Sequence, residues 1–121
     1  MQIIEEKIRD LLSDDDNVRF AYLFGSYANK MATEKSDIDL AVFLDIPATD
    51  AILSLHHRLQ KTLRKELDLV ILNKIKNLYL LEAIINDGIV VKDATMRPEY
   101  EVEMQHRIID FKAFKRMINA A

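Results

Sequence analysis

Hydrophobic residues recur along the chain with two different periods, one typical of helices and one typical of strands. In several stretches they return every third or fourth residue, which predicts amphipathic helices. Between these stretches lie short apolar runs rich in β-branched and aromatic residues, and such runs predict buried strands. We therefore predict helices over 3–12, 27–31, 50–65, 78–86 and 97–118, and strands over 18–24, 37–44, 66–72 and 89–91.

Helices and strands alternate in this order, which favours a mixed α/β (α+β) domain built on a small sheet. The chain has 121 residues with only two glycines and two prolines, so these few residues mark boundaries. Pro98 fits the first turn of the last helix, and Asp87-Gly88 fits the end of the helix before it. The length suits one domain, so we expect residues 1–121 to form a single domain that ends in the helix at about 97–118.

Composition narrows the class of protein. The chain is 50% hydrophobic and 31% charged, which suits a folded domain with a substantial core. A formal net charge of −3 argues against bulk attraction to nucleic acid, so we expect no direct nucleic-acid binding. The lack of cysteine excludes disulfides and thiol catalysis and fits a reducing cytoplasm. No apolar run approaches about 18 residues and the N-terminal stretch is charged, so we expect a cytoplasmic protein without a membrane segment or signal peptide.

Two aspartates at the start of the second predicted strand are the first candidates for chemistry. Asp37 and Asp39 lie two residues apart, and residues two apart on a strand point to the same face. Like charges this close repel each other unless a proton or a cation neutralises one of them. Oxygen ligands favour a hard ion such as Mg²⁺, so the pair is a candidate metal site. Taken alone, such a pair is also compatible with a solvated strand edge.

A third carboxylate in the next predicted strand extends this candidate site. If that strand lies beside the one that carries the aspartate pair, Asp68 joins the pair on one face of the sheet. Three carboxylates can hold two metal ions, of which one activates the attacking oxygen and the other stabilises the leaving group. Glu66 has the same strand parity as Asp68, so it stays open as a ligand or as a charged neighbour.

The dipeptide Gly25-Ser26 ends the first predicted strand and is a candidate phosphate-binding turn. A glycine lets a phosphate approach the backbone, and N–H groups at the start of a helical turn attract an anion. The hydroxyl of Ser26 can donate a hydrogen bond to a phosphate oxygen. By itself, a Gly-Ser pair after a strand is also compatible with an ordinary turn.

The spacing between the two motifs makes them far more specific together than apart. Ser26 is followed by ten residues and then by Asp37-x-Asp39, which gives the pattern G-S-x10-D-x-D. At average residue frequencies these four fixed positions recur by chance on the order of 10⁻³ times in a chain of this length. The pattern is the signature of the DNA polymerase β-like nucleotidyltransferase superfamily, whose members this chain resembles.

Within that superfamily the chain resembles the minimal nucleotidyltransferases (MNT), the antitoxins encoded beside HEPN toxins. The resemblance covers residues 18–91 and rests on YLFGSYANKMATEKSDIDLAVF and on LDLVIL, of which the second is the less distinctive. It implies a small mixed β-sheet flanked by helices, in the nucleotidyltransferase (DNA polymerase β-like) fold. It assigns nucleotide binding to Gly25 and Ser26, and catalysis and Mg²⁺ binding to Asp37, Asp39 and Asp68.

The resemblance also implies a function. Some family members transfer AMP from ATP to a tyrosine hydroxyl of the partner HEPN toxin, an RNase, and neutralise it, so we expect an Mg²⁺-dependent protein adenylyltransferase that acts as an antitoxin. Larger members hold the acceptor with a further domain, whereas here only one helix follows the core, so we expect the acceptor to be held by a partner, by a second copy, or by very little of the chain. A homodimer and a hetero-oligomer both stay open. The alternatives are an antitoxin that only masks the toxin, and a nucleotidyltransferase that modifies another acceptor with a separate substrate-binding subunit.

The last predicted helix has an apolar arc wide enough for two roles. Packing on the domain's own core and contact with a partner or a second copy are both compatible with its pattern. The apolar residues that recur at helical spacing are Tyr100, Met104, Ile108, Phe111 and Ile118.

Several other polar residues are weaker candidates. Tyr27, Lys30 and Lys35 lie between the two halves of the motif, where they can meet a nucleotide, although lysines in loops are usually solvated. His56 and His57 are adjacent on a predicted helix and point in different directions, so we interpret them as solvated side chains rather than as metal ligands.

Overall fold

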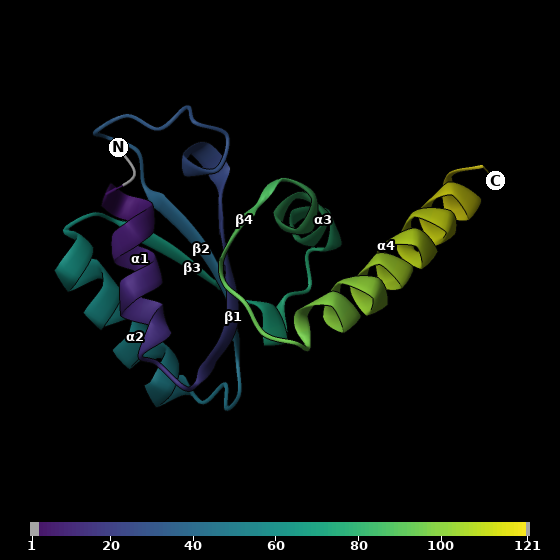
Figure 1. The fold of residues 1–121 in the computed structure, drawn as a ribbon. Helices are drawn as coiled ribbons and strands as arrows, with labels where there is room; N and C mark the ends of the chain where they lie inside the picture. Colours follow the sequence, from purple (N-terminus) through teal and green to yellow (C-terminus); the bar gives the residue numbers. More distant parts are fainter. Residues whose placement is uncertain (1–2, 121) are drawn as a thin grey trace.

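The computed structural model describes residues 3–120 and shows a four-stranded sheet between two layers of helices (Figure 1). Two single turns of 3₁₀ helix, η1 and η2, follow β1 and β3. The mixed α/β class predicted from the sequence is confirmed. The elements are α1 (Ile3–Ser13), β1 (Val18–Phe24), η1 (Gly25–Tyr27), β2 (Ile38–Leu44), α2 (Thr49–Leu63), β3 (Leu67–Ile71), η2 (Leu72–Lys74), α3 (Leu78–Asp87), β4 (Ile89–Lys92) and α4 (Arg97–Asn119).

The sheet has the strand order β3-β2-β1-β4 and is mixed. Strand β1 pairs antiparallel with both β2 and β4, whereas β2 and β3 are parallel and joined through α2. The end of β1 therefore meets the starts of β2 and β3 at one edge of the sheet. In the register, Asp39 is the Cα partner of both Phe24 on β1 and Asp68 on β3.

Each face of the sheet is covered by its own pair of helices (Figure 1). On one face α1 and α2 pack on alternate strand residues such as Ile38, Leu40 and Val42, which are fully buried. On the other face α3 and α4 pack on the residues between them, of which Ala41 is one. Because strand side chains alternate, Asp39 has the parity of Ala41 and points to the α3/α4 face.

Local chemistry explains where several elements begin and end. The side chain of Asn77 accepts hydrogen bonds from the N–H groups of Tyr79 and Leu80, which caps the start of α3. Helix α2 ends because Arg64 adopts a left-handed conformation with φ of 55°. Pro98 lies in the first turn of α4, as predicted, where its missing N–H leaves no hydrogen bond unmade.

Several predicted elements differ from the observed ones in their bounds, and two of these differences bear on the candidate site. The helix predicted over 27–31 is instead the turn η1, which ends at Tyr27, because Lys30 adopts a φ of 62° that a right-handed helix excludes. Strand β2 begins at Ile38 rather than Asp37, since the first pair of the β2–β3 ladder is Ile38 with Leu67. Asp37 therefore lies just outside the sheet.

The base of α4 is attached to the sheet by an alternating chain of charged and polar groups. The Tyr22 hydroxyl donates a hydrogen bond to Glu101 Oε2 at 2.5 Å. Arg97 donates to the same Glu101 oxygen at 2.7 Å and to Asp93 Oδ1 at 2.7 Å. The ring of Tyr100 packs nearby against Phe20, with centroids 5.2 Å apart. These contacts fix the direction in which α4 leaves the sheet.

Within residues 3–120, no helix is both long enough and apolar enough to cross a bilayer.

Candidate active site

Asp39 and Asp68 lie side by side at the edge of the sheet where β2 and β3 begin. They are Cα partners in the parallel ladder, so both side chains stand on the α3/α4 face. Their apolar neighbours Ile38, Leu40 and Leu67 point to the other face and are buried there. Since a slip of one residue would expose those apolar side chains, core packing fixes the register that brings the two carboxylates together.

The environment of Asp39 disfavours its charged form. The pKa of Asp39 is raised above its ordinary value of 3.8, first by partial burial and then by the charge of Asp68 and a hydrogen bond with its carboxyl group. The charge of Asp37 adds a smaller increase. A divalent cation would relieve this repulsion, so the electrostatics fit a metal site built from oxygen ligands.

Gly25 connects the Gly-Ser turn directly to this carboxylate. Its φ of +71° is in the left-handed region that favours glycine. A Cβ at this position would overlap Oδ2 of Asp39, so the backbone of the turn lies against the carboxylate. Only glycine allows this approach. As a result, the Gly-Ser turn is in direct contact with the Asp39 carboxylate, a candidate metal ligand.

The backbone after Gly25 forms a tight turn. The Gly25 carbonyl accepts hydrogen bonds from the N–H groups of Ala28 at 3.1 Å and Asn29 at 3.2 Å, and the Ser26 carbonyl accepts one from Met31 at 2.9 Å. The first N–H groups of such a turn have no partner within it. They are therefore placed to meet an anion, as expected for a phosphate-binding turn.

The three aspartates are not gathered equally. Asp37 is exposed and lies one residue before β2, although its charge acts on Asp39. Across residues 3–120, no three acidic, histidine or cysteine side chains are close enough together to hold a metal ion. The structure thus brings Asp39 and Asp68 together and leaves Asp37 at the margin.

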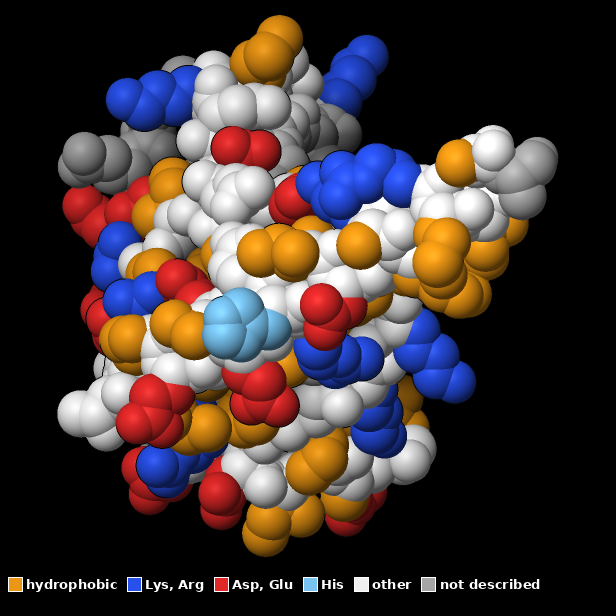
Figure 2. All heavy atoms as spheres, turned by 90° about the vertical axis from the view of Figure 1, so that its right-hand side faces the viewer, with side chains coloured by type: hydrophobic (Ala, Val, Ile, Leu, Met, Phe, Trp, Pro, Cys, Tyr) orange, Lys and Arg blue, Asp and Glu red, His pale blue; other side chains and the backbone are white. Residues whose placement is uncertain are grey.

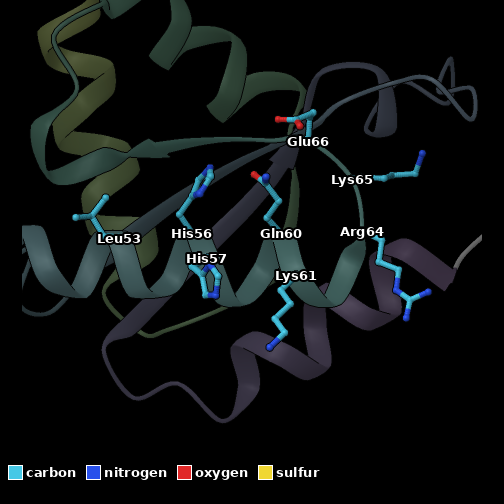
Figure 3. Close-up of a pocket in the computed structure, with 8 residues that line it drawn as sticks. All are labelled: Leu53, His56, His57, Gln60, Lys61, Arg64, Lys65 and Glu66. Atoms are coloured by element: carbon cyan, nitrogen blue, oxygen red, sulfur yellow. The ribbon is translucent and has the colours of Figure 1, made fainter.

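Glu66, which the sequence left open as a further ligand or a charged neighbour, lies outside this cluster. It precedes β3, is exposed, and borders a hollow on the outer side of α2 (Figure 3). The acids that raise the pKa of Asp39 are Asp68 and Asp37, and Glu66 is not among them. Of the two same-parity acids, Asp68 is the one that interacts with Asp39.

That hollow, of about 860 Å³, is not part of the candidate site. Figure 3 shows that its side chains come from α2 and from the segment leading into β3. His56 has its Nε2 3.0 Å from the Leu67 carbonyl oxygen, so it is a half-buried contact between α2 and β3 rather than a solvated side chain as predicted. None of the residues of the Gly-Ser and Asp-x-Asp motifs lines the hollow.

A second cavity, of about 650 Å³, borders the turn on the other side. Tyr27 and Lys30, two of the weaker candidates, line it together with Leu23, whereas Lys35 does not. Since Leu23 belongs to the α1/α2 face, this cavity lies across the sheet from the carboxylates.

One positioning residue gave no sequence signal. Lys65 Nζ donates a hydrogen bond to the Glu34 carbonyl at 2.6 Å, which ties the loop between the two motif halves to the end of α2. The two residues are 31 positions apart, and no local pattern in the sequence distinguishes a lysine just after a helix that makes such a contact from one that is solvated.

A family model and curated relatives match the chain. Residues 6–96 match the family model described as "Polymerase beta, Nucleotidyltransferase". Two proteins of Methanocaldococcus jannaschii, both provisionally named as protein adenylyltransferases, are similar to it. One is 38% identical over 89 residues, which covers 73% of this chain and 91% of the relative. The other is 37% identical over 91 residues, with the same coverage.

Solved structures are similar over nearly the whole chain. A chain of a toxin–antitoxin crystal structure with AMP-PNP has a TM-score of 0.81 and 27% identity, covering 96% of this chain and 95% of that one. A chain of the structure of the tri-AMPylated Shewanella oneidensis HEPN toxin in complex with MNT antitoxin has a TM-score of 0.76 and 26% identity, covering 98% and 95%.

Proposed function

Because the chain belongs to the polymerase β-type nucleotidyltransferase family, we propose that it transfers AMP from ATP to a tyrosine hydroxyl of a HEPN-type RNase toxin and thereby neutralises it. The contact of Asp39 with Asp68 and Gly25 is the main support for this proposal. It places two carboxylates that can bind a metal ion next to a turn that can bind phosphate. The provisional names of the relatives and the AMPylated toxin of a similar complex support AMP as the group and the toxin as the acceptor.

Each motif residue has a role in this proposal. Gly25 and Ser26 bind the triphosphate of ATP through backbone N–H groups and the hydroxyl. Asp37, Asp39 and Asp68 hold Mg²⁺, which all-oxygen ligands favour. When bound there, Mg²⁺ neutralises charge on the phosphates and makes pyrophosphate a better leaving group. Because the reaction uses ATP, we place the protein in the cytoplasm.

The chemistry is a single displacement at phosphorus. The tyrosine oxygen of the toxin attacks the α-phosphorus in line, the bond from that phosphorus to the oxygen bridging it to the β-phosphate breaks, and pyrophosphate leaves. The proton of the tyrosine passes to a carboxylate. Asp68 is the candidate for this base, because it is exposed where it pairs with Asp39 at the start of β3.

Intact-mass spectrometry tests the proposal directly. A cognate HEPN-type toxin is incubated with this protein, ATP and Mg²⁺, and the mass of the toxin is measured. We expect a gain of one or more AMP units that is absent with Asp39→Asn. The matched control is Asp45→Asn, which makes the same change at an exposed aspartate just beyond the other end of β2.

The other outcomes select the alternatives. A tight complex without any mass gain would favour an antitoxin that only masks the toxin. Normal transfer by Asp39→Asn would refute the metal-ligand role of this residue. Transfer that requires another protein as acceptor would favour a nucleotidyltransferase with a separate substrate-binding subunit.

A further inference from the structure

The end of α4 extends past the elements it packs on. Helices α3 and α4 run antiparallel, with Asn86 Oδ1 accepting a hydrogen bond from Gln105 at 3.3 Å and Glu82 Oε2 accepting one from Lys112 at 2.6 Å. Because α3 begins at Leu78, it offers nothing to the residues of α4 beyond this point. We call residues 113–119 the α4 tip, and Figure 1 shows this segment leading away from the sheet.

The α4 tip carries large apolar side chains in water. Phe114, Met117 and Ile118 are 53%, 67% and 52% exposed. Phe114 and Ile118 follow Phe111 at the spacing of one helix face, and Phe111 itself packs on Tyr79 with ring centroids 5.4 Å apart. Figure 2 shows hydrophobic side chains gathered at this projecting end, with lysine and arginine side chains beside them.

A helical end of this kind gains little from its own domain. Helical turns without tertiary contacts are marginal in water, and most helix stability in proteins comes from packing of an apolar face. Every described residue of the α4 tip is exposed. Large apolar side chains exposed together on one helix face are typical of a binding surface.

Charge selects the kind of partner. The α4 tip contains Lys115 and Arg116 and no acidic residue, although the whole chain carries a net charge of −3. Two tips packed against each other would bring these cations together, which disfavours a second copy as the occupant. An apolar groove lined by acidic side chains would meet both the hydrophobic face and the cations.

We propose that the α4 tip docks the acceptor protein by inserting into an apolar, acidic groove on its surface, an inference that rests on the proposed function. The base of α4 packs through Tyr100 and Met104 on the sheet face of Ala41, which is also the face of Asp39 and Asp68. A protein held by the tip therefore lies on the carboxylate side of the sheet, where a tyrosine must arrive.

The test compares two double variants of the full chain. Phe114→Glu/Ile118→Glu changes the tip, and the matched control Ile46→Glu/Leu53→Glu changes two equally apolar residues that are 64% exposed elsewhere. Calorimetry measures binding to the cognate HEPN-type toxin without ATP, and thermal unfolding checks that each variant is folded. We expect the tip variant to weaken binding at least about tenfold and the control to leave it unchanged. High salt should weaken wild-type binding.

Several outcomes would overturn the docking proposal. These are no complex with the wild-type chain, equal binding by the tip variant and the wild type, or sedimentation showing that the chain alone forms a dimer that the tip variant loses. Intact-mass measurements separate this proposal from the proposed function. Binding that depends on the tip, without AMP transfer, would support the docking site and refute the proposed function. AMP transfer that is unchanged in the tip variant would support the proposed function and refute the docking site.

Discussion

Two clusters of charged side chains on the same side of the sheet differ in how their charges are balanced. At the strand edge the charged groups that act on Asp39 are acids, and the pKa of Asp39 is raised by burial, then by Asp68, then by Asp37. At the base of α4 the signs alternate, and the pKa of Asp93 is lowered, chiefly by the hydrogen bond from Arg97. The charges at the base of α4 are neutralised by the chain's own residues, whereas the acidic charges around Asp39 are not.

This difference separates a scaffold from a site. The alternating cluster links β1 to α4, and its short hydrogen bonds need nothing from outside the chain. The acidic cluster is unfavourable by itself, and only a proton or a bound cation relieves it. Groups held in an unfavourable state by the fold are common at functional sites, which is why the acidic cluster is the candidate for chemistry.

The largest expected effect is on AMP transfer by Asp39→Asn. The asparagine keeps the shape of the side chain but removes the negative charge that would hold Mg²⁺, so we expect transfer to fall at least about 100-fold. The initial rate of toxin AMPylation measures it. Full activity in the Asp45→Asn control is required, because a similar loss there would point to damage unrelated to the site.

Replacement of Gly25 by alanine should harm both stability and activity. The left-handed φ and the overlap of the new Cβ with Asp39 predict a loss of about 1–3 kcal/mol in the free energy of unfolding. Urea unfolding measures the loss. If the overlap contributes, the double variant with Asp39→Ala will recover part of it, and purely additive effects would show that strain in φ alone is responsible.

The alternating cluster should affect stability and not chemistry. Glu101→Ala removes the partner of both Tyr22 Oη and Arg97, so we expect a loss of about 1–2 kcal/mol in the free energy of unfolding. At a temperature where the variant is folded, its transfer rate should equal that of the wild type. A lower transfer rate together with a lower affinity for Mg²⁺ in Glu101→Ala would contradict a purely structural role for this cluster.

The two clusters should respond to pH with opposite sign. A raised pKa in the folded state means that Asp39 favours folding at low pH, and that this contribution is lost as pH rises above the ordinary value of 3.8. Without divalent ions, Asp39→Asn should therefore match the wild type in acid and become the more stable protein towards neutral pH.

Asp93→Asn is the comparison for this experiment. The lowered pKa of Asp93 contributes stability above its ordinary value of 3.8 that is lost as pH falls, so its asparagine variant should become the less stable protein towards neutral pH. Urea unfolding from pH 3 to 8 distinguishes the two signs. The same sign in both variants would contradict the contrast between the clusters.

The smallest expected effect concerns two buried tyrosines. Within residues 3–120 the Tyr100 hydroxyl has no hydrogen-bond partner, and burial raises its pKa to about 12. Tyr100→Phe should therefore change the free energy of unfolding by less than about 1 kcal/mol, or stabilise the protein. Tyr22→Phe removes a bond to Glu101 and should be the more destabilising of the two. The reverse order, measured by urea unfolding, would contradict this assignment.

Much of the fold follows from local patterns. Hydrophobic spacing predicts four of the helices and all four strands, since each period is set by the geometry of its own element. The exception is the helix predicted over 27–31, where the left-handed Lys30 backbone prevails over the helical spacing. Of the candidate site, the spacing of the motif predicts Gly25, Ser26 and the aspartate pair, and the less distinctive LDLVIL segment predicts Asp68 while leaving Glu66 open.

What the sequence alone determined is therefore local: the elements, the motif, and an apolar arc on the last helix. Only the tertiary structure decided which same-parity acid acts on Asp39, since strand register depends on core packing between segments distant in the chain. It also decided that Glu101 meets Tyr22, 79 positions away, and that α3 covers only part of α4. Such pairings depend on how whole elements pack, so the local spacing of hydrophobic residues does not predict them.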